Sequence, residues 1–412
     1  MTDHPTQPPA QRPAQPPAQH PVQPPAQRPA QPSALHLAVA LDGAGWHPAA
    51  WRESPARPSQ LFSARYWAGL VAEAERGLLD FVTIEDALGL QSGFDGPDER
   101  VDQVRGRFDA VLLAARLAPL TTSIGLVPTA TVTHTEPFHV AIGIATLDHI
   151  SGGRAGWRPQ ISGRAAEARH FGRRPFPPLD PRDDEQVRPL FEEAADAVEV
   201  ARRLWDSWDD DAEIRDVPTG RFVDRDRLHY IDFAGRFFSV KGPSITPRSP
   251  QGQPVVTALA HARIPYEFAA GAADVVYVTP HSAEEAASIV AEIRELSGEV
   301  RIFADLLVLL GEDAAARKAR LDDLDGAALD SDAAIFTGTV AELADLLIAW
   351  QRAGIQGYRL RPGAVPYDLK QITRGLTAEL RGRGVFRREY ESGTLRGLLG
   401  LPRPAGRYAE VR

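Results

Sequence analysis

The residues of this chain best placed for chemistry follow the apolar run TSIGLV. They are Thr129, Thr131, Thr133 and His134. Polar side chains gathered at the end of a strand in an α/β protein usually face a ligand. Hydroxyls and an imidazole can hydrogen-bond the edge of a planar heterocycle, and the imidazole of His134 can also protonate an oxygen intermediate. The alternative is a hydroxyl-capped turn into a helix that begins at Pro137.

Two further candidates follow earlier apolar runs. In ALDGAGWHPAAWR (40–52), Trp46, His47 and Trp51 surround two glycines. Glycine lets the backbone approach a ligand closely, and tryptophan offers a flat wall for a conjugated ring. The alternative is a tight turn with buried tryptophans. Asp86, after DFVTI, can accept a hydrogen bond from a heterocyclic N–H or, equally, cap the segment that follows.

Several other chemistries lack support in the sequence. His134, His139 and His149 are spaced by five and ten residues, which does not place them on one helical face as a metal site requires, so no metal is expected. Cysteine is absent, which excludes disulfides and thiolate chemistry. Neither a Walker loop nor a Gly-x-Ser-x-Gly elbow occurs. The net charge of -9 argues against nucleic acid or an anionic membrane as a partner.

Short apolar runs alternate with amphipathic segments, and these elements must position the candidates. Strands are predicted at 35–41, 80–84, 122–127, 155–161, 254–260, 274–279, 300–310 and 357–362. Helices are predicted at 61–77, 101–118, 137–149, 188–205, 266–271, 283–297, 340–353 and 369–383. Eight strands alternating with eight helices indicate a (β/α)8 TIM barrel with insertions. The alternative, a doubly wound open sheet, is weakened because no Gly-x-Gly-x-x-Gly follows the first strand.

A barrel of this kind places its active site where the strands end. The predicted strand ends nominate residues 42–47, 86, 129–134, 158–162, 260–263 and 279–281. These segments are far apart in the sequence but should meet on one face.

The chain divides into two predicted parts. Residues 1–33 carry an eight-residue Gln/Pro/Ala repeat, which cannot pack a core and predicts a disordered tail. The alternative is a docking segment for a proline-recognising module. Residues 34–412 form one predicted barrel domain, with an insertion around 206–250. No run of about 18 apolar residues and no secretory signal occurs, so we expect a cytoplasmic protein.

Six segments resemble the luciferase-like family of flavin-dependent monooxygenases, in the branch of the nitrilotriacetate, dibenzothiophene-sulfone and dimethyl-sulfide enzymes. The matching segments are GAGWHPAAWR (43–52), AERGLLDFVTIED (74–86), TATVTHTEPFHVAIGIATLDHISGGRAGW (129–157), LWDSW (204–208), GRFFSVKGPSITPRSPQGQPVV (235–256) and RGRGVFRREYESGTLRGLLGL (381–401). They span residues 35–402, nearly all of the chain except the tail. The resemblance implies a (β/α)8 barrel with insertions.

The resemblance also implies a two-component activity. A separate NAD(P)H:flavin reductase would supply reduced FMN, which reacts with oxygen to oxygenate a small or medium organic substrate. Asp86, Thr131 and His134 would contact the flavin ring, and Trp46 and His47 would line the substrate side. The family is commonly dimeric or tetrameric, so a homodimer or homotetramer is expected.

Two departures from the family pattern affect the expected site. Arg158 stands where relatives carry an asparagine at the flavin. At 257–261 the small residues and serine that hold the FMN phosphate in relatives are replaced by TALAH. We therefore hypothesise that Arg263 binds the phosphate bidentately. The candidate set is His47 and His134 as catalytic residues, Trp46 as a substrate contact, and Asp86, Thr129, Thr131, Trp157, Arg158, His261 and Arg263 as cofactor contacts.

Two alternatives to the reduced-FMN monooxygenase remain open at this level. One is a catalytically silent paralogue that binds a ligand or pairs with an active subunit, and the changes at 258–261 favour it. The other is a deazaflavin-dependent oxidoreductase, which shares the barrel but not, as a rule, the arginine-rich segment at 381–390.

Overall fold

Eight parallel strands close on themselves into a barrel, which confirms the predicted (β/α)8 TIM barrel. The computed structural model describes residues 34–91 and 100–408. The predicted tail, 1–33, lies outside the described residues. In spatial order the barrel strands are β1 (His36–Leu41), β2 (Phe81–Ile84), β3 (Gly125–Thr131), β4 (Gly156–Gln160), β9 (Val255–Leu259), β10 (Val275–Val278), β11 (Arg301–Leu310) and β13 (Gly357–Pro362), and β13 pairs with β1.

The first strand shows why apolar runs form this barrel. Leu37, Val39 and Leu41 belong to the core between the strands and the helices, whereas Ala38 belongs to the core inside the barrel. Successive side chains of a strand point to opposite faces, so a strand buried on both faces is apolar almost throughout. Each of these outward leucines contributes about 1.5–3 kcal/mol by burial.

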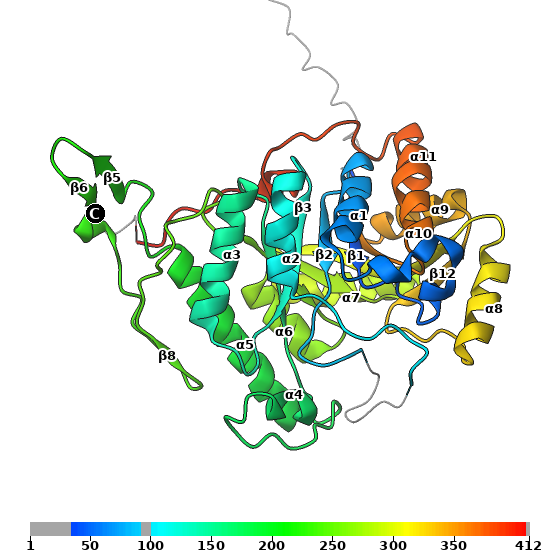
Figure 1. Ribbon diagram of the computed structural model, residues 1–412, viewed down its shortest axis with the longest axis horizontal. Helices are drawn as coiled ribbons and strands as arrows, with labels where there is room; N and C mark the ends of the chain where they lie inside the picture. The colour runs from blue at the N-terminus through cyan, green and yellow to red at the C-terminus, as the bar shows by residue number, and fades with distance from the viewer. Residues whose placement is uncertain (1–33, 92–99, 409–412) are drawn as a thin grey trace, which may run out of the picture. The chain divides into compact units, whose positions relative to one another are not determined.

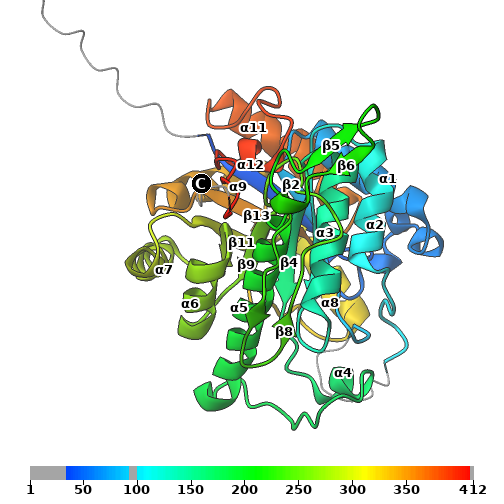
Figure 2. The ribbon, with the colours of Figure 1, turned by 90° about the vertical axis from the view of Figure 1, so that its left-hand side faces the viewer.

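Helices surround the barrel, as Figure 1 and Figure 2 show from two directions. The longer ones are α1 (Ala64–Arg76), α2 (Ala110–Leu117), α3 (Pro137–Ser151), α5 (Asp184–Trp205), α6 (Arg263–Ala272), α7 (Ala283–Leu296), α8 (Ala314–Asp325) and α9 (Val340–Arg352). A continuous helical stretch follows β13 and comprises α10 (Tyr367–Lys370), a π-helical turn (Gln371–Leu376) and α11 (Thr377–Gly382). Two short helices are α4 (Ala165–Arg169) and α12 (Leu395–Leu398).

The lower end of the barrel, where the strands begin, is filled by apolar side chains and closed by α12. Leu395 and Leu399 pack against Phe81, Val127 and other side chains of the interior core. One buried and one partly buried ion pair hold this carboxyl-terminal segment under the strands. Arg387 Nη2 lies 2.5 Å from Asp80 Oδ1, and Arg396 Nη2 lies 2.9 Å from Asp274 Oδ1. The segment 381–401 therefore contributes Leu395 and Leu399 to the interior core of the barrel.

The structure corrects two predicted boundaries. The helix predicted at 101–118 begins only at Ala110, because Asp109 accepts a hydrogen bond from the Leu112 N–H and caps it there. Residues 101–108 instead run outside any helix or strand along the barrel mouth. The strand predicted at 122–127 continues to Thr131, so Thr129 and Thr131 belong to β3 and not to a turn.

Elements outside the eight-fold repeat decorate the barrel. In the chain, α8 and β12 (Ala334–Gly338) lie between β11 and α9. Neither of them is predicted from the sequence. β12 pairs with the second half of β11. Within 206–250, two hairpins form from β5 (Glu213–Asp216) with β6 (Arg221–Val223) and from β7 (Phe233–Ala234) with β8 (Ser239–Val240). Among the described residues, no helix is long and apolar enough to cross a membrane.

Candidate functional site

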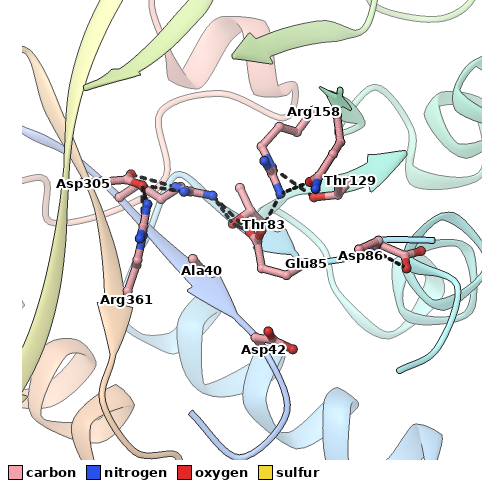
Figure 3. A network of polar contacts seen from close by, with 12 residues as sticks. Ala40, Asp42, Thr83, Glu85, Asp86, Thr129, Arg158, Asp305 and Arg361 are labelled. Carbon is pink, nitrogen blue, oxygen red and sulfur yellow. Dashed lines mark hydrogen bonds and ion pairs between the residues drawn. The ribbon is translucent and has the colours of Figure 1, made fainter. Parts of the chain in front are cut away.

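Charged side chains fill the barrel just below its mouth, the end at which the strands terminate (Figure 3). Strand alternation turns Glu85, Arg158, Asp305, Arg359 and Arg361 inward. All five side chains are at most 9% exposed. Ionised groups are rarely buried without partners, so their contacts decide what this layer can do.

The five charges form one chain of ion pairs. Glu85 pairs with Arg158 on one side and accepts a hydrogen bond from Arg359 Nη1 at 3.0 Å on the other. Asp305 accepts from Arg359 Nε at 2.8 Å and from Arg361 Nε at 3.0 Å. Burial raises the pKa of Glu85, but the cations Arg158 and Arg359 outweigh burial and leave this pKa below its usual value. The layer is therefore ionised and internally satisfied.

Aromatic rings brace the two arginines of β13. The Arg359 guanidinium lies 4.4 Å from the Tyr277 ring centre, and that of Arg361 lies 4.7 Å from the Trp46 ring centre. Arg361 also donates to Asp332 Oδ2 at 3.1 Å. A guanidinium stacked on a ring and paired with carboxylates holds a fixed orientation. These side chains consequently form a rigid floor under the mouth.

Two adjoining cavities open above this floor. One has a volume of about 310 Å3 and is lined by Asp42, Ala87, Leu90, Gln91, Arg107, Gln160, Ile161, Ser162, Gly163, Arg164 and Glu167. The other has a volume of about 180 Å3 and is lined by residues 42–48, Gln91 and 103–105. Asp42 and Gln91 belong to both. The mouth therefore offers two neighbouring compartments, a larger one with a mostly polar wall and a smaller one with a mixed wall.

Asp42 is the titratable group at the boundary between these two cavities. Burial raises the pKa of Asp42 to about 6; Arg107 opposes this rise, while Glu85 and Asp86 add to it. Arg107 Nη2 lies 3.4 Å from Asp42 Oδ2, a long contact that compensates the carboxylate only in part.

Replacing Asp42 with asparagine should stabilise the protein at neutral pH. A carboxyl whose folded-state pKa exceeds its unfolded value contributes stability below the unfolded pKa, and this contribution is lost as pH rises through the folded pKa. The stability of the wild type relative to Asp42→Asn should thus fall by about 2 kcal/mol between pH 4 and pH 7. Urea unfolding across this range measures the difference. Asp323→Asn, at an exposed carboxylate of α8, is the control, and its stability relative to the wild type should not change across this pH range. The same result for Asp42→Asn would contradict the prediction.

The structure places Trp46 and His47 beside the smaller cavity, but both are engaged elsewhere. The Trp46 indole donates to the Ala40 carbonyl at 2.8 Å. His47 Nδ1 accepts from the Ala49 N–H at 3.1 Å, and Nε2 contacts Asp322 Oδ1 at 3.1 Å. Burial lowers the pKa of His47, while Asp322 acts in the opposite direction. His47 therefore ties the loop after β1 to α8.

Asp86, Thr129 and Thr131 share a third cavity of about 340 Å3 between α2 and α3. Asp86 accepts hydrogen bonds from the Ala87 N–H at 2.7 Å and the Ala110 N–H at 2.9 Å. These bonds correspond to the capping alternative for this residue. The Thr129 hydroxyl also accepts from Arg158 Nε at 3.0 Å, so Thr129 belongs to the charged floor.

His134 and Trp157 do not line the two mouth cavities. His134 adopts a φ of 72° and packs its ring between Phe171 and Phe176. Burial lowers its pKa, with Arg174 acting in the same direction. The Trp157 indole packs edge-on against Trp205 in the layer between barrel and helices. The structure thus places neither of these two predicted side chains on the walls that Asp42 lines.

His261 lies on the exposed segment between β9 and α6, and the exposed Arg263 is the first residue of α6. The Arg263 guanidinium is 51% exposed and contacts Glu267 at 3.0 Å and Glu292 at 3.3 Å. Ala262, the N-cap of α6, has no side-chain acceptor for the first turn of the helix. The Arg263 and Ile264 N–H groups therefore face the helix end without a capping side chain.

Sequence reasoning missed most of the residues that build the floor and the cavity wall, namely Glu85, Arg107, Asp305, Asp332, Arg359 and Arg361. Asp42 and Gln160 lie within the nominated strand ends 42–47 and 158–162, but the sequence assigned neither of them a role. A usable signal was present, because GYRLRP and RIFADLLVLL carry charges within otherwise apolar strands. Among residues 34–91 and 100–408, no cluster of three or more potential ligands could hold a metal ion.

Comparison with known proteins assigns the family. The profile described as Luciferase-like monooxygenase matches residues 44–343. N-acetyl-S-(2-succino)cysteine monooxygenase from Bacillus subtilis (strain 168) is 29% identical, covering 91% of this chain and 98% of its own. Nitrilotriacetate monooxygenase component A from Aminobacter aminovorans is 27% identical over the same shares. A structure of riboflavin lyase with modified FMN and riboflavin has a TM-score of 0.78 at 23% identity, covering 89% of this chain and 96% of that one. The chain belongs to the luciferase-like monooxygenase family of oxidoreductases.

Proposed function

We propose that this chain is the oxygenating component of a two-component flavin-dependent monooxygenase. It would use reduced FMN and oxygen to oxygenate a small or medium organic substrate, and a separate NAD(P)H:flavin reductase would provide the reduced FMN. The family profile over residues 44–343 carries the proposal. The paired cavities at the mouth support it, because such a reaction needs one compartment for a cofactor and one for a substrate.

The residues at the mouth fit FMN. Gln160 and Ser162 line the larger cavity and would present an amide and a hydroxyl to the flavin ring. The uncapped first turn of α6 would hold the phosphate, since free backbone N–H groups and the helix dipole favour an anion. When bound, reduced FMN would supply the two electrons that reduce oxygen. The charged floor would close the barrel interior beneath the ring. Arg158 would support this floor through Glu85 and Thr129.

Replacing Ala262 with aspartate should separate phosphate binding from folding. An aspartate N-cap should stabilise α6 by about 1 kcal/mol. Its carboxylate would also occupy the N–H groups and repel the phosphate, so affinity for reduced FMN should fall at least about 10-fold. Affinity for reduced riboflavin, which has no phosphate, should stay unchanged. Anaerobic fluorescence titrations with both flavins measure these affinities.

Arg263→Ala is the matched variant for this experiment. Because its guanidinium already contacts Glu267 and Glu292, we expect at most about a 3-fold loss of reduced-FMN affinity. A larger loss in Arg263→Ala than in Ala262→Asp would assign the phosphate to the guanidinium, as the sequence hypothesis has it. Unchanged FMN affinity in both variants would place the phosphate elsewhere.

Anaerobic titration with reduced FMN, followed by mixing with oxygen, tests the proposed function. We expect binding of reduced FMN and a transient flavin absorbance that is distinct from those of reduced and oxidised FMN. A chain that binds neither reduced FMN nor a reduced deazaflavin would instead be a ligand-binding or partner subunit. Preference for the reduced deazaflavin would favour the deazaflavin-dependent alternative.

A homodimer through α2 and α3 is part of the proposal. Leu112 is 71% exposed, and Leu120 and Ile150 are each 49% exposed. Val111 and Val140 line the cavity between the two helices. A helix that is apolar on nearly every face, as α3 is, is normally covered.

Leu112→Glu should weaken this dimer at least about 10-fold, because it places a charge in an apolar contact. Sedimentation velocity over a concentration series measures the effect. Leu324→Glu, which places the same charge at a 40% exposed leucine of α8, should leave the dimer intact. A wild-type chain that sediments only as a monomer would exclude the interface.

A further inference from the structure

Among the residues that the structure describes, Asp42 is the one ionisable side chain that lines both mouth cavities. Of the described lining residues, only Asp42 and Gln91 belong to both. The Gln91 side-chain amide is already hydrogen-bonded to the Gly106 backbone. Its nitrogen donates to the Gly106 carbonyl at 2.9 Å, and its oxygen accepts from the Gly106 N–H at 2.8 Å. Asp42 Oδ2 has the long contact from Arg107, and Oδ1 has no hydrogen-bond partner among the described residues. An acceptor atom thus stands free between two compartments.

The loop that carries Asp42 is fixed in place. The Trp46 N–H donates to the Pro362 carbonyl at 3.0 Å, and the His47 N–H donates to the Gly363 carbonyl at 2.9 Å. In the opposite direction, the Val365 N–H donates to the Ala44 carbonyl at 2.8 Å. These bonds anchor the turn after β1 on the turn after β13. A side chain on such a support keeps its position relative to the molecules on either side.

We propose that Asp42 is the proton-transfer residue of this site, a carboxylate that accepts a proton from the molecule in one cavity and passes it to the molecule in the other. The inference rests on the proposed function, in which reduced FMN occupies one cavity and oxygen with the organic substrate occupies the other. An O–H bond forms at Oδ1 as the donor's N–H or O–H bond breaks, and the same proton then leaves for the accepting oxygen. The electrons pass from reduced FMN to oxygen, so Asp42 ends each cycle as it began.

The surroundings of Asp42 suit a group that changes charge in each cycle. Glu85 and Asp86 face it from the end of β2 and favour its neutral form. Arg107, from the segment before α2, and Arg158, from β4, favour its ionised form. Arg164 and Glu167 line the far wall of the larger cavity, and Arg105 lines the smaller one. Burial raises the pKa of Asp42 to about 6, so the carboxylate is ready to accept a proton at neutral pH.

Infrared titration of the flavin-free protein tests the first part of the inference. A protonated carboxyl band with a midpoint near pH 6 should be present in the wild type and absent in Asp42→Asn. Asp86→Asn should move the midpoint down, because it removes a neighbouring negative charge. Arg107→Met should move it up, because it removes the cation. A wild type without this band would overturn the inference.

Hydrogen peroxide release after mixing the reduced-FMN-bound enzyme with oxygen, without any organic substrate, tests the transfer itself. Two electrons and two protons then pass from reduced FMN to oxygen. In the wild type the rate should rise with pH around a midpoint near 6. Asp42→Asn should lose this dependence and react at least about 100-fold more slowly at pH 8. The midpoints of Asp86→Asn and Arg107→Met should shift as in the infrared titration, and Asp323→Asn should match the wild type.

The two proposals fail in different ways. An Asp42→Asn variant that binds reduced FMN and keeps the wild-type pH profile refutes the proton-transfer role and leaves the proposed function standing. A wild-type chain that binds no reduced FMN refutes the proposed function, and the proton-transfer role falls with it.

Discussion

Asp305→Ala should lower the free energy of unfolding by about 3–5 kcal/mol. The Asp305 side chain is fully buried and is the carboxylate that Arg359 and Arg361 share. Its loss would leave both guanidinium groups short of a counter-charge in the barrel interior, where an uncompensated charge is far more costly than a missing surface pair. The expected defect is therefore much larger than that of an ordinary aspartate-to-alanine substitution.

Urea unfolding followed by circular dichroism measures this loss. Asp332→Ala is the matched control, because Asp332 contacts the same Arg361 but its side chain is 44% exposed. We expect it to cost no more than about 1 kcal/mol. Equal losses in the two variants would show that the buried pairs do not hold the floor of the mouth.

Gly45→Ala should cost about 3 kcal/mol or more. Gly45 has a φ of +128°, which side-chain-bearing residues rarely adopt. A Cβ there would lie 2.4 Å from the Gly363 carbonyl oxygen and 2.6 Å from the Ala364 Cα. Both obstacles are backbone atoms, so the turn after β1 would have to separate from the turn after β13.

Gly43→Ala provides the comparison for Gly45→Ala within the same turn. Gly43 has a φ of +46°, but its Cβ would meet only the Val104 side chain at 3.4 Å. We expect a cost of about 1 kcal/mol from backbone conformation alone. Because the turn carries Asp42, Gly45→Ala should also weaken reduced-FMN binding. Similar unfolding stabilities for Gly45→Ala and Gly43→Ala would contradict the steric argument.

The sequence predicts the barrel well because its strands are buried on both faces. An apolar run such as LHLAVAL must be covered on both sides, and the repeated alternation with helices leaves few architectures. The same reasoning misses α8 and β12. The helix AAARKARLDDLD is polar over most of its surface, and AIFTG is too short to stand out from a loop.

The candidate site is harder to predict because its contacts join distant positions. His47 reads as an exposed histidine beside tryptophans, but its partner Asp322 lies 275 residues away on α8. The ring of His134 is covered by Phe171 and Phe176, whose positions depend on a loop without regular pattern. Strand periodicity is compatible with the inward direction of Arg158 and Arg359, which alternate with residues that face the helices. It does not reveal that both pair with Glu85, because pairing across a barrel depends on register and rotamer.

The position of α12 makes the completion of this barrel depend on residues that are synthesised after all eight of its strands. Leu395 and Leu399 close the barrel from below, against strands that leave the ribosome hundreds of residues earlier. Until they arrive, Phe81, Val127 and their neighbours have no cover on that side. A nascent chain that has all eight strands but lacks α12 therefore exposes an apolar opening, which is the kind of surface that chaperones bind. Chains released before α12 is made would keep that opening and would be directed to aggregation or degradation.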